Sequence, residues 1–187
     1  MSMPMLKRRW TFDDLEDLPD DGNRYEVIDG ELFVTPAPSY KHQAAVAEFH
    51  AVLRDYLSGL QLGYPFFSPA DVVFSPTRAI QPDIFVVPLI NGRRPERFED
   101  VNRLLLAVEV LSPSSARADR VAKRTVYRQE AVDEYWIVDM DSRTVERSTP
   151  GDRRVDVFDD RLTWRPTGAP DALSVDLRAY FSRVLDG

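Results

Sequence analysis

The sequence predicts an α/β (α+β) fold, with a mixed central sheet flanked by helices, and three features carry that prediction. Residues 104–111 form an eight-residue run with one polar member, Glu109, as expected of a strand buried on both faces. Residues 39–60 carry apolar side chains at helical spacing, which predicts one long amphipathic helix. Asp29-Gly30 between two β-prone runs predicts a tight hairpin turn.

The remaining elements follow in chain order. A short acidic helix near Thr11 precedes the hairpin of residues 24–34. Gly63 and Pro65 are expected to close the region after the long helix, because both residues are typical of turns. Beyond them the patterns predict strands at 71–74, 81–87, 104–112 and 134–139, a helix at 116–131, β segments at 144–148 and 154–158, and a short helix at 177–184.

The length of 187 residues fits a single domain with one sizeable core. We expect a single domain over residues 1–187, because no repeat, low-complexity tract or linker interrupts the pattern. Within it we distinguish an N-terminal extension (1–22), a core (24–139) and a C-terminal β/α extension (140–187). A mixed sheet with helices on its faces is the natural packing of these elements.

Composition narrows the chemistry. The absence of cysteine excludes disulfides, thiolate catalysis and thiolate metal sites, and two histidines are too few for a histidine-rich metal cage. A metal would therefore bind to oxygen, which favours Mg²⁺ or Mn²⁺. No apolar run is long enough for a membrane helix, and no secretory signal pattern follows the basic residues near the start, so we expect a cytoplasmic protein. The net charge of −7 argues against nonspecific coating of nucleic acid.

Two carboxylates stand out. Glu109 lies in the middle of the apolar run, where a buried charge is costly unless it is paired or binds a metal. Asp83 follows Pro82 at the start of another predicted strand, a place where a sheet exposes side chains to a cleft. If the two strands are neighbours, both carboxylates can bind one cation.

The helix predicted after Glu109 supplies cationic groups. At 100° per residue, its face toward the sheet is formed by residues 118, 121, 122, 125, 126 and 129. Asp119, Lys123 and Tyr127 form an i, i+4, i+8 row along one border of that face. Residues 117–128 hold five basic residues and one acidic residue, a balance of +4, and the arginines lie away from the core: Arg117, Arg120, Arg124 and Arg128.

Together these groups suit phosphodiester hydrolysis. The two carboxylates would hold Mg²⁺ or Mn²⁺, which activates a water and neutralises phosphate charge. Lys123 would stabilise the pentavalent transition state or orient the water. The arginines would bind backbone phosphates.

The order and spacing of several short motifs resemble the PD-(D/E)XK restriction-endonuclease-like superfamily, and most closely the Uma family of bacterial endonucleases. The resemblance covers roughly residues 24–139. The motifs are Arg24-Tyr-Glu-Val-Ile-Asp-Gly-Glu31, His42-Gln43, Gln81-Pro-Asp83, Val108-Glu-Val-Leu-Ser-Pro-Ser-Ser115, the Asp119/Lys123/Tyr127 row and Asp133-Glu-Tyr-Trp-Ile-Val-Asp139. It implies a restriction-endonuclease-like fold and a metal-dependent nuclease.

One position departs from the superfamily pattern. The lysine expected two residues after the acid would be position 111, which is Leu111. The resemblance implies a migrated lysine, with Lys123 on the next helix reaching the same space. It also makes Glu26 a candidate additional metal ligand, and Gln81, His42, Asp119 and Tyr127 candidate supporting residues.

Each candidate also has a purely structural interpretation. Glu109 could be a buried ion-pair partner, and Asp83 a turn residue. Asp119 and Lys123 could form an ordinary i, i+4 helix pair. The arginines could be a solvated face, and the other three could serve structure alone: Glu26 in its hairpin, His42 at a helix start and Tyr127 in packing.

The sequence leads to a hypothesis and a rival. The hypothesis is a metal-dependent nuclease that hydrolyses DNA, with Asp83 and Glu109 on Mg²⁺ and Lys123 at the scissile phosphate. The rival is a catalytically inactive module of the same fold that binds nucleic acid or protein as a scaffold. A third possibility, another metal-assisted hydrolase, would share the carboxylates but not the arginine stripe. Double-strand cleavage needs two sites, so a homodimer is expected, through residues 144–158 or the N-terminal segment.

Overall fold

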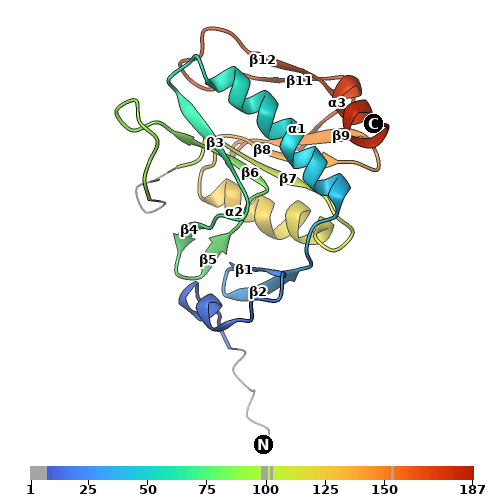
Figure 1. Ribbon diagram of the computed structural model, residues 1–187. Helices are drawn as coiled ribbons and strands as arrows, with labels where there is room; N and C mark the ends of the chain where they lie inside the picture. Colours follow the sequence, from blue (N-terminus) through green and yellow to red (C-terminus); the bar gives the residue numbers. More distant parts are fainter. Residues whose placement is uncertain (1–7, 98–100, 102, 153) are drawn as a thin grey trace, which may run out of the picture.

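A six-stranded mixed sheet forms the centre of the computed structural model, which describes residues 8–97, 101, 103–152 and 154–187 (Figure 1). The two middle strands, β7 (Leu106–Val110) and β8 (Tyr135–Asp139), run parallel, and every other neighbouring pair is antiparallel. The remaining strands in spatial order are β10 (Asp156–Phe158) and β9 (Thr144–Ser148) beside β8, and β6 (Ile84–Pro88) and β3 (Gly63–Phe67) beside β7.

Helices cover both faces of this sheet. On one face α1 (Tyr40–Leu57) and α3 (Leu177–Leu185) pack against alternate strand residues such as Val108 and Trp136. On the other face lies α2 (Arg124–Gln129), against Ala107 and Ile137. Because successive strand side chains point to opposite faces, Glu109 must point to the α2 face together with Ala107. Figure 1 shows α1 and α2 on either side of the sheet.

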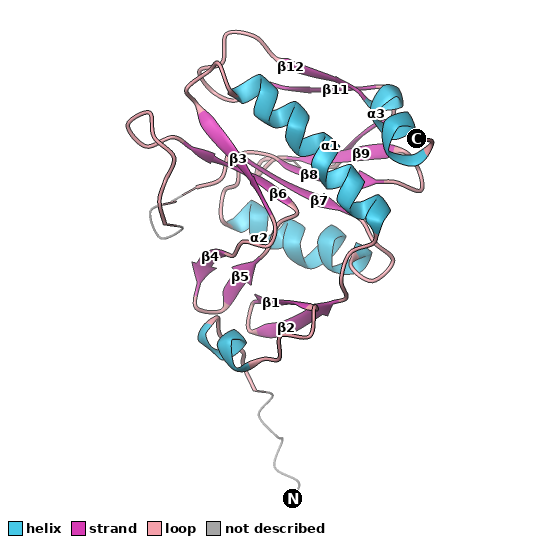
Figure 2. Cartoon of the chain, in the orientation of Figure 1, coloured by secondary structure: helices cyan, strands magenta, loops and turns pink. Residues whose placement is uncertain are grey.

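A smaller four-stranded sheet lies beside α2, at the end of the molecule where the described chain begins (Figure 2). Its order is β2 (Glu31–Thr35), β1 (Arg24–Ile28), β5 (Arg78–Ile80) and β4 (Val72–Ser75). The hairpin predicted at Asp29-Gly30 is confirmed: their φ angles are +53° and +82°, as a two-residue turn with two left-handed positions requires. A short 3₁₀ helix, η1 (Asp13–Asp17), precedes this sheet.

The C-terminal part packs beside α1 on the same face of the central sheet. A two-stranded ribbon, β11 (Arg161–Trp164) and β12 (Leu173–Asp176), leads into α3. Trp164 packs edge-on against Trp136 of the central sheet, with ring centroids 5.9 Å apart. The Tyr180 hydroxyl donates to the carbonyl of Ala45 in α1 at 2.9 Å, which ties α3 to the main helix.

The sequence patterns missed four strands: β3, β5, β11 and β12. The expectation that Gly63 and Pro65 close a loop was wrong, because both lie within β3. β3 is the edge of the central sheet, where a proline without an N–H is tolerated. Gly63 is required by close packing, since a Cβ there would lie 2.9 Å from the carbonyl oxygen of Val87.

The phase predicted for the helix after Glu109 was also wrong. It begins with a π-helical turn, η3 (Ala118–Lys123), which continues into α2. The wider turn rotates the face, so that Asp119, Lys123 and Tyr127 are buried against the sheets whereas Val121, assigned to the core, is 61% exposed. The apolar pattern misleads here because the polar row pairs with carboxylates of the two sheets.

The overall architecture confirms the predicted mixed α/β fold with a buried central strand. Over the described residues, no helix combines the length and the apolar character that crossing a bilayer requires. The division into one domain with two extensions stays a prediction.

Candidate active site

The pairing of β6 with β7 brings the two predicted carboxylates together. Ile84 is paired with Val108 in the antiparallel register, so Asp83, one residue before β6, is opposite Glu109. Side chains directly opposite each other in such a pair have Cβ atoms about 5 Å apart. Both residues are 1% exposed, and both side chains lie on the α2 face. The convergence predicted from the sequence is therefore present.

Asp83 is held from three sides. Its Oδ1 accepts a hydrogen bond from the Arg24 guanidinium at 2.8 Å, and its Oδ2 accepts one from the backbone N–H of Val110 at 2.8 Å. His42 Nε2 lies 3.2 Å from Oδ2 and 3.0 Å from the carbonyl oxygen of Val110. Burial alone would raise the pKa of Asp83, but the His42 hydrogen bond and the Arg24 charge lower it to about 2. Asp83 is thus a fixed, ionised carboxylate.

Lys123 lies at the centre of the carboxylates, from the last position of the π-helical turn. Its Nζ is 2.9 Å from Glu26 of β1, 3.1 Å from Glu109 of β7 and 3.4 Å from Asp119 on its own helix. The side chain is 2% exposed, and burial alone would lower its pKa. The charges of Glu109 and Glu26 outweigh that effect and raise the pKa, so Lys123 is a buried ammonium group.

In Glu109 and Asp119 the pKa shifts favour the neutral form, whereas the shift of Lys123 favours the charged form. Burial raises the pKa of Glu109 well above its usual value, although the Lys123 charge opposes this shift. Its Oε1 also accepts a hydrogen bond from the Tyr127 hydroxyl at 2.9 Å. Burial likewise raises the pKa of Asp119, against the Lys123 charge. Glu109 and Asp119 are therefore the two carboxyls whose charged form most needs a neighbouring cation.

The charge balance fits a divalent cation. The cluster consists of four acids and two cations. With every carboxylate ionised, the acids contribute −4 and Arg24 and Lys123 contribute +2, so the net charge is −2; the acids are Glu26, Asp83, Glu109 and Asp119. Both oxygens of Asp119 are buried without a hydrogen bond from the described residues. Within the described part of the chain no three acidic or histidine side chains form a ready-made metal cage. Two carboxylates with an open site suit Mg²⁺, which usually keeps waters and binds substrate phosphates in addition.

A cavity of about 370 Å³ gives access to this cluster. Asp83, Glu109 and Lys123 border it, together with Arg24, whereas Glu26 and Asp119 do not. Its walls come from the segment before α1, the Ser112–Ala116 loop and the end of β8. Of the acids around Lys123 and Arg24, Asp83 and Glu109 therefore border the cavity, whose rim also carries Asp139 and Asp141. Holding Lys123 in place accounts for the contacts of Glu26, which was also predicted as a metal ligand.

The four arginines predicted to bind phosphate lie in different surroundings. Arg120 and Arg124 are ion-paired with Glu146 on β9, and Arg120 also with Asp139 on β8. Of the four, only Arg120 borders the cavity. The other two, Arg117 and Arg128, are exposed. The stripe is thus partly neutralised by the sheet beside it, which the helix sequence alone does not reveal.

Two of the predicted supporting residues, His42 and Gln81, contact the site in different ways. His42, the third residue of α1 and 7% exposed, orients Asp83, as described above. Gln81 acts through its backbone: its N–H donates to Glu26 Oε1 at 2.8 Å and its carbonyl accepts from Arg24 at 3.0 Å. The Gln81 side chain instead donates to Asp71 at 3.0 Å, away from the cluster.

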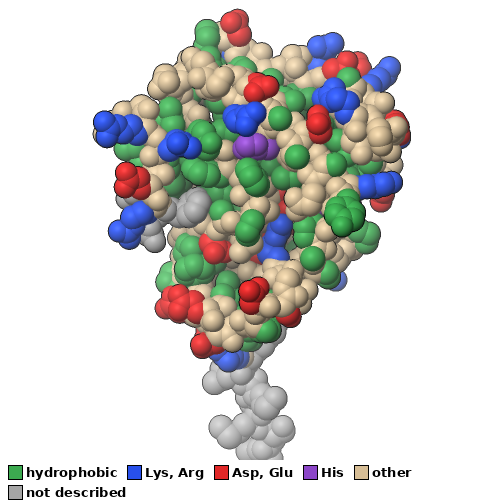
Figure 3. All heavy atoms as spheres, viewed as in Figure 1, with side chains coloured by type: hydrophobic (Ala, Val, Ile, Leu, Met, Phe, Trp, Pro, Cys, Tyr) green, Lys and Arg blue, Asp and Glu red, His purple; other side chains and the backbone are tan. Residues whose placement is uncertain are grey.

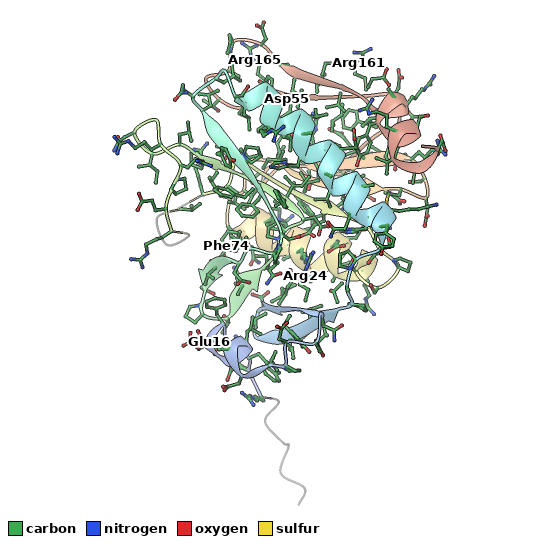
Figure 4. The ribbon with its side chains drawn as sticks, in the orientation of Figure 1. Glu16, Arg24, Asp55, Phe74, Arg161 and Arg165 are labelled. Carbon is green, nitrogen blue, oxygen red and sulfur yellow. The ribbon has the colours of Figure 1, made fainter. Side chains whose placement is uncertain are left out.

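Arg24 is the site residue that sequence reasoning missed. Its guanidinium contacts Asp83, Gln81 and Ser68, and Figure 4 shows it between the β1–β2 hairpin and the layer formed by the central sheet and α2. A signal was present: Arg24 and Glu26 are two residues apart on one strand and so share its face. Two opposite charges on the buried side of a strand indicate partners in another element.

Comparison with known proteins shows the family to which the chain belongs. The family model described as "Uma2: Putative restriction endonuclease" matches residues 12–178. A crystal structure of a putative nuclease belonging to DUF820, from Anabaena variabilis, shares the fold with a TM-score of 0.77 and 24% identity, over 94% of this chain and 99% of that one. No curated protein matches. The family model covers almost the whole chain and includes every residue of the cluster, so the chain belongs to the Uma2 family of nuclease-like proteins.

Proposed function

We propose that this protein is a metal-dependent nuclease that hydrolyses DNA phosphodiester bonds. The observation that carries the proposal is the convergence of Asp83, Glu109 and Lys123 at one cavity. Charged side chains that are almost fully buried and still border a cavity are uncommon outside functional sites. Membership of a family described as restriction endonucleases supports the same reaction class.

Asp83 and Glu109 are the residues that would hold Mg²⁺ or Mn²⁺. When bound, such an ion supplies Lewis-acid chemistry: it lowers the pKa of a water and neutralises charge on a phosphate. Arg24 and His42 keep Asp83 ionised and oriented for this task. Hydrogen bonds and ion pairs from these neighbours fix the carboxylate before a ligand arrives, which limits the reorganisation that the reaction requires.

Lys123 would act on the phosphate. Lys123 borders the cavity, and the carboxylates around its ammonium group raise its pKa and keep it protonated. A protonated amine donates hydrogen bonds to the oxygens on which charge develops as the pentavalent transition state forms. Glu26 and Asp119, which do not border the cavity, contact the ammonium group and hold it in place.

One observation favours the scaffold alternative. Lys123 already has three carboxylates within 3.4 Å, so a folded module without metal or substrate would keep most of its charges paired. The excess of negative charge at the cavity distinguishes the two functions, because a nuclease uses it to bind a cation and a scaffold does not.

The test is a cleavage assay with a matched variant. Purified protein is incubated with supercoiled plasmid and with single-stranded DNA in Mg²⁺, Mn²⁺ or EDTA, beside Glu109→Gln, which keeps the shape but removes the charge. We expect cleavage that needs metal and disappears in the variant. Folded wild-type protein that cleaves nothing, and takes up no Mg²⁺ or Mn²⁺ in calorimetry, would leave the scaffold function.

Two further parts of the proposal concern assembly and location. Cutting both strands of a duplex requires two active sites, and we propose a homodimer to supply them in a cytoplasmic enzyme. Light scattering during size-exclusion chromatography tests the assembly. A mass near 21.4 kDa at working concentrations would exclude the dimer.

A further inference from the structure

A second cavity, of about 280 Å³, lies between the helix that carries Lys123 and the chain that joins β9 to β10. Arg120 borders both this cavity and the catalytic cavity, so the two are neighbours along one helix. The four carboxylates of the buried cluster do not border the second cavity. The hydrolysis proposed above therefore leaves this cavity without a role.

Four arginines border the second cavity. Arg120, Arg124 and Arg128 form one row on the helix, because residues four positions apart share a helix face, and Arg154 comes from the segment just before β10. Among the described residues in its wall, Asp152 is the one acid. Such a wall suits an anionic ligand, since the planar guanidinium group matches the geometry of phosphate oxygens.

Two of these arginines have no protein partner. The side chains of Arg128 and Arg154 are exposed and form no ion pair or hydrogen bond with any other residue that the structure describes. Arg124 pairs with Glu146 through Nη2, and its Nη1 has no acceptor within the same part of the chain. Donors are therefore free for a ligand without breaking an existing contact.

The second cavity also has the sign of charge that a phosphate requires. The arginines outnumber the acids around them, which are Asp152 in the wall and the two ion-pair partners Asp139 and Glu146. The catalytic cluster is net negative when its acids are ionised, and the chain as a whole carries −7. On the face seen in Figure 3, basic and acidic side chains alternate without a continuous basic surface. The second cavity thus offers a local attraction for phosphate that the catalytic cluster lacks.

The spacing of the row fits a nucleic-acid strand. Arg120 and Arg128 are eight residues apart, which corresponds to about 12 Å along a helix axis. A B-form strand rises about 3.4 Å per nucleotide, so this length covers roughly three nucleotides. Ser148 and Thr149 add hydroxyl groups to the wall, and both residue types are common phosphate donors.

We infer that the second cavity binds a backbone phosphate of DNA, a few nucleotides from the phosphate at the catalytic cavity. Arg128 and Arg154 would make the main contacts, with Arg124 beside them. The inference rests on the proposed nuclease function and adds a binding site outside the catalytic cavity. Because the contact is to phosphate, the site positions the DNA and does not select its sequence.

The experiment measures binding of a fluorescein-labelled 24-base-pair duplex by anisotropy. The full chain is used in EDTA, and Glu109→Gln is used in Mg²⁺, so that the probe is not consumed. Arg128→Gln and Arg154→Gln are exposed changes and are expected to fold normally, which melting curves check. Arg161→Gln is the matched control, because Arg161 is an exposed arginine that borders neither cavity.

We expect each single variant to weaken binding at least threefold and the double variant at least tenfold, with less than a twofold change in the control. The dependence of log K on log salt concentration should become shallower by about 0.9 in the double variant, the value for one lost phosphate contact. In cleavage assays the same variant should raise KM and leave kcat unchanged, since the contact is made equally before and during the reaction.

Inorganic phosphate tests the alternative source of the anion. It is titrated by calorimetry into the wild type and into the Arg128→Gln, Arg154→Gln double variant. Phosphate uptake that the double variant loses, together with unchanged duplex binding, would identify a site for a free anion and overturn the inference.

The remaining outcomes separate this inference from the proposed function. Duplex binding that falls only in the two cavity variants, without cleavage by the wild type, would keep the inference and remove the nuclease. Metal-dependent cleavage with unchanged affinity, KM and salt dependence in the double variant would keep the nuclease and overturn the inference. Wild-type protein that binds no duplex would overturn the inference as well.

Discussion

Replacing Lys123 by Met is the perturbation that most directly tests the buried cluster. Met keeps most of the volume of the stem but removes the ammonium group that three carboxylates contact within 3.4 Å. The cluster then holds four carboxylates against Arg24 alone, so its net charge changes from −2 to −3 when all are ionised. Such a site must take up protons, bind a cation or unfold.

The expected loss of unfolding free energy follows from the burial of Lys123 and of the carboxylates that contact it. Breaking a buried ion pair by removing one member destabilises a protein by about 3–5 kcal/mol, because the remaining charge is left uncompensated. Lys123, Glu26, Glu109 and Asp119 are all at most 2% exposed, so this range applies without the reduction that solvent screening brings at a surface. For a domain of this size the loss corresponds to a melting temperature lower by roughly 6–20 °C.

The stability lost in Lys123→Met is expected to change with pH in one direction. The pKa values of Glu109 and Asp119 are already raised by burial, so their contribution to stability is present below their ordinary values and is lost as pH rises. Without Lys123 these pKa values rise further. The difference between variant and wild type should therefore be larger at pH 8 than at pH 5.

Urea unfolding of Lys123→Met at both pH values measures this difference. Lys41→Met is the matched control, because Lys41 is exposed and its loss should change stability by less than about 0.5 kcal/mol. A loss below about 1 kcal/mol at pH 8, or a deficit that does not vary with pH, would refute the reasoning.

Tyr127→Phe removes the hydrogen bond to Glu109 and should lower the unfolding free energy by about 1.5–3 kcal/mol in urea titrations; an unchanged midpoint would contradict it. Gly30→Ala places a side chain at a φ of +82° and should destabilise by about 1–2 kcal/mol, seen as a lower melting temperature. Arg24→Met should destabilise by about 3 kcal/mol at pH 6, and the deficit should shrink as pH falls from 3.8 toward 2, since the stability that Asp83 gains from its lowered pKa is lost there; acid unfolding curves that stay parallel would argue against this. Mg²⁺ at about 100 times its Kd should raise wild-type stability by about 2.7 kcal/mol, reversibly with EDTA, and should not stabilise Glu109→Gln.

Leu111 stands where the resemblance to the superfamily predicted a lysine, and its surroundings are apolar. Leu111 comes directly after β7, is 8% exposed and packs in the apolar cluster between the central sheet and α2. A lysine on the helix, one π turn after Asp119, reaches Glu109 from above the sheet instead. The ammonium group that contacts Glu109 therefore comes from the helix and not from the strand that carries Glu109.

The sequence determined the elements with strong local signals. The alternation and turn chemistry of the first hairpin, the apolar run around Glu109 and the long helix that begins after Ser39 all depend on neighbouring residues, and each is present in the structure. The pairing of Asp83 with Glu109 could be anticipated as well, because consecutive strands tend to be neighbours and both side chains have reason to avoid an apolar core.

Only the tertiary structure decided where the charged side chains lie, because their partners are distant in the sequence. The burial of Lys123 depends on Glu26, 97 positions earlier, and Arg24 is a site residue because of Asp83, 59 positions away. The helix pattern placed the polar row at a border because a hydrophobicity pattern treats every charged residue as exposed. A charged side chain that is paired with an opposite charge can nevertheless be buried. Edge strand β3 and the cavity bordered by Asp83 and Glu109 likewise come from packing between separate segments, which local patterns do not encode.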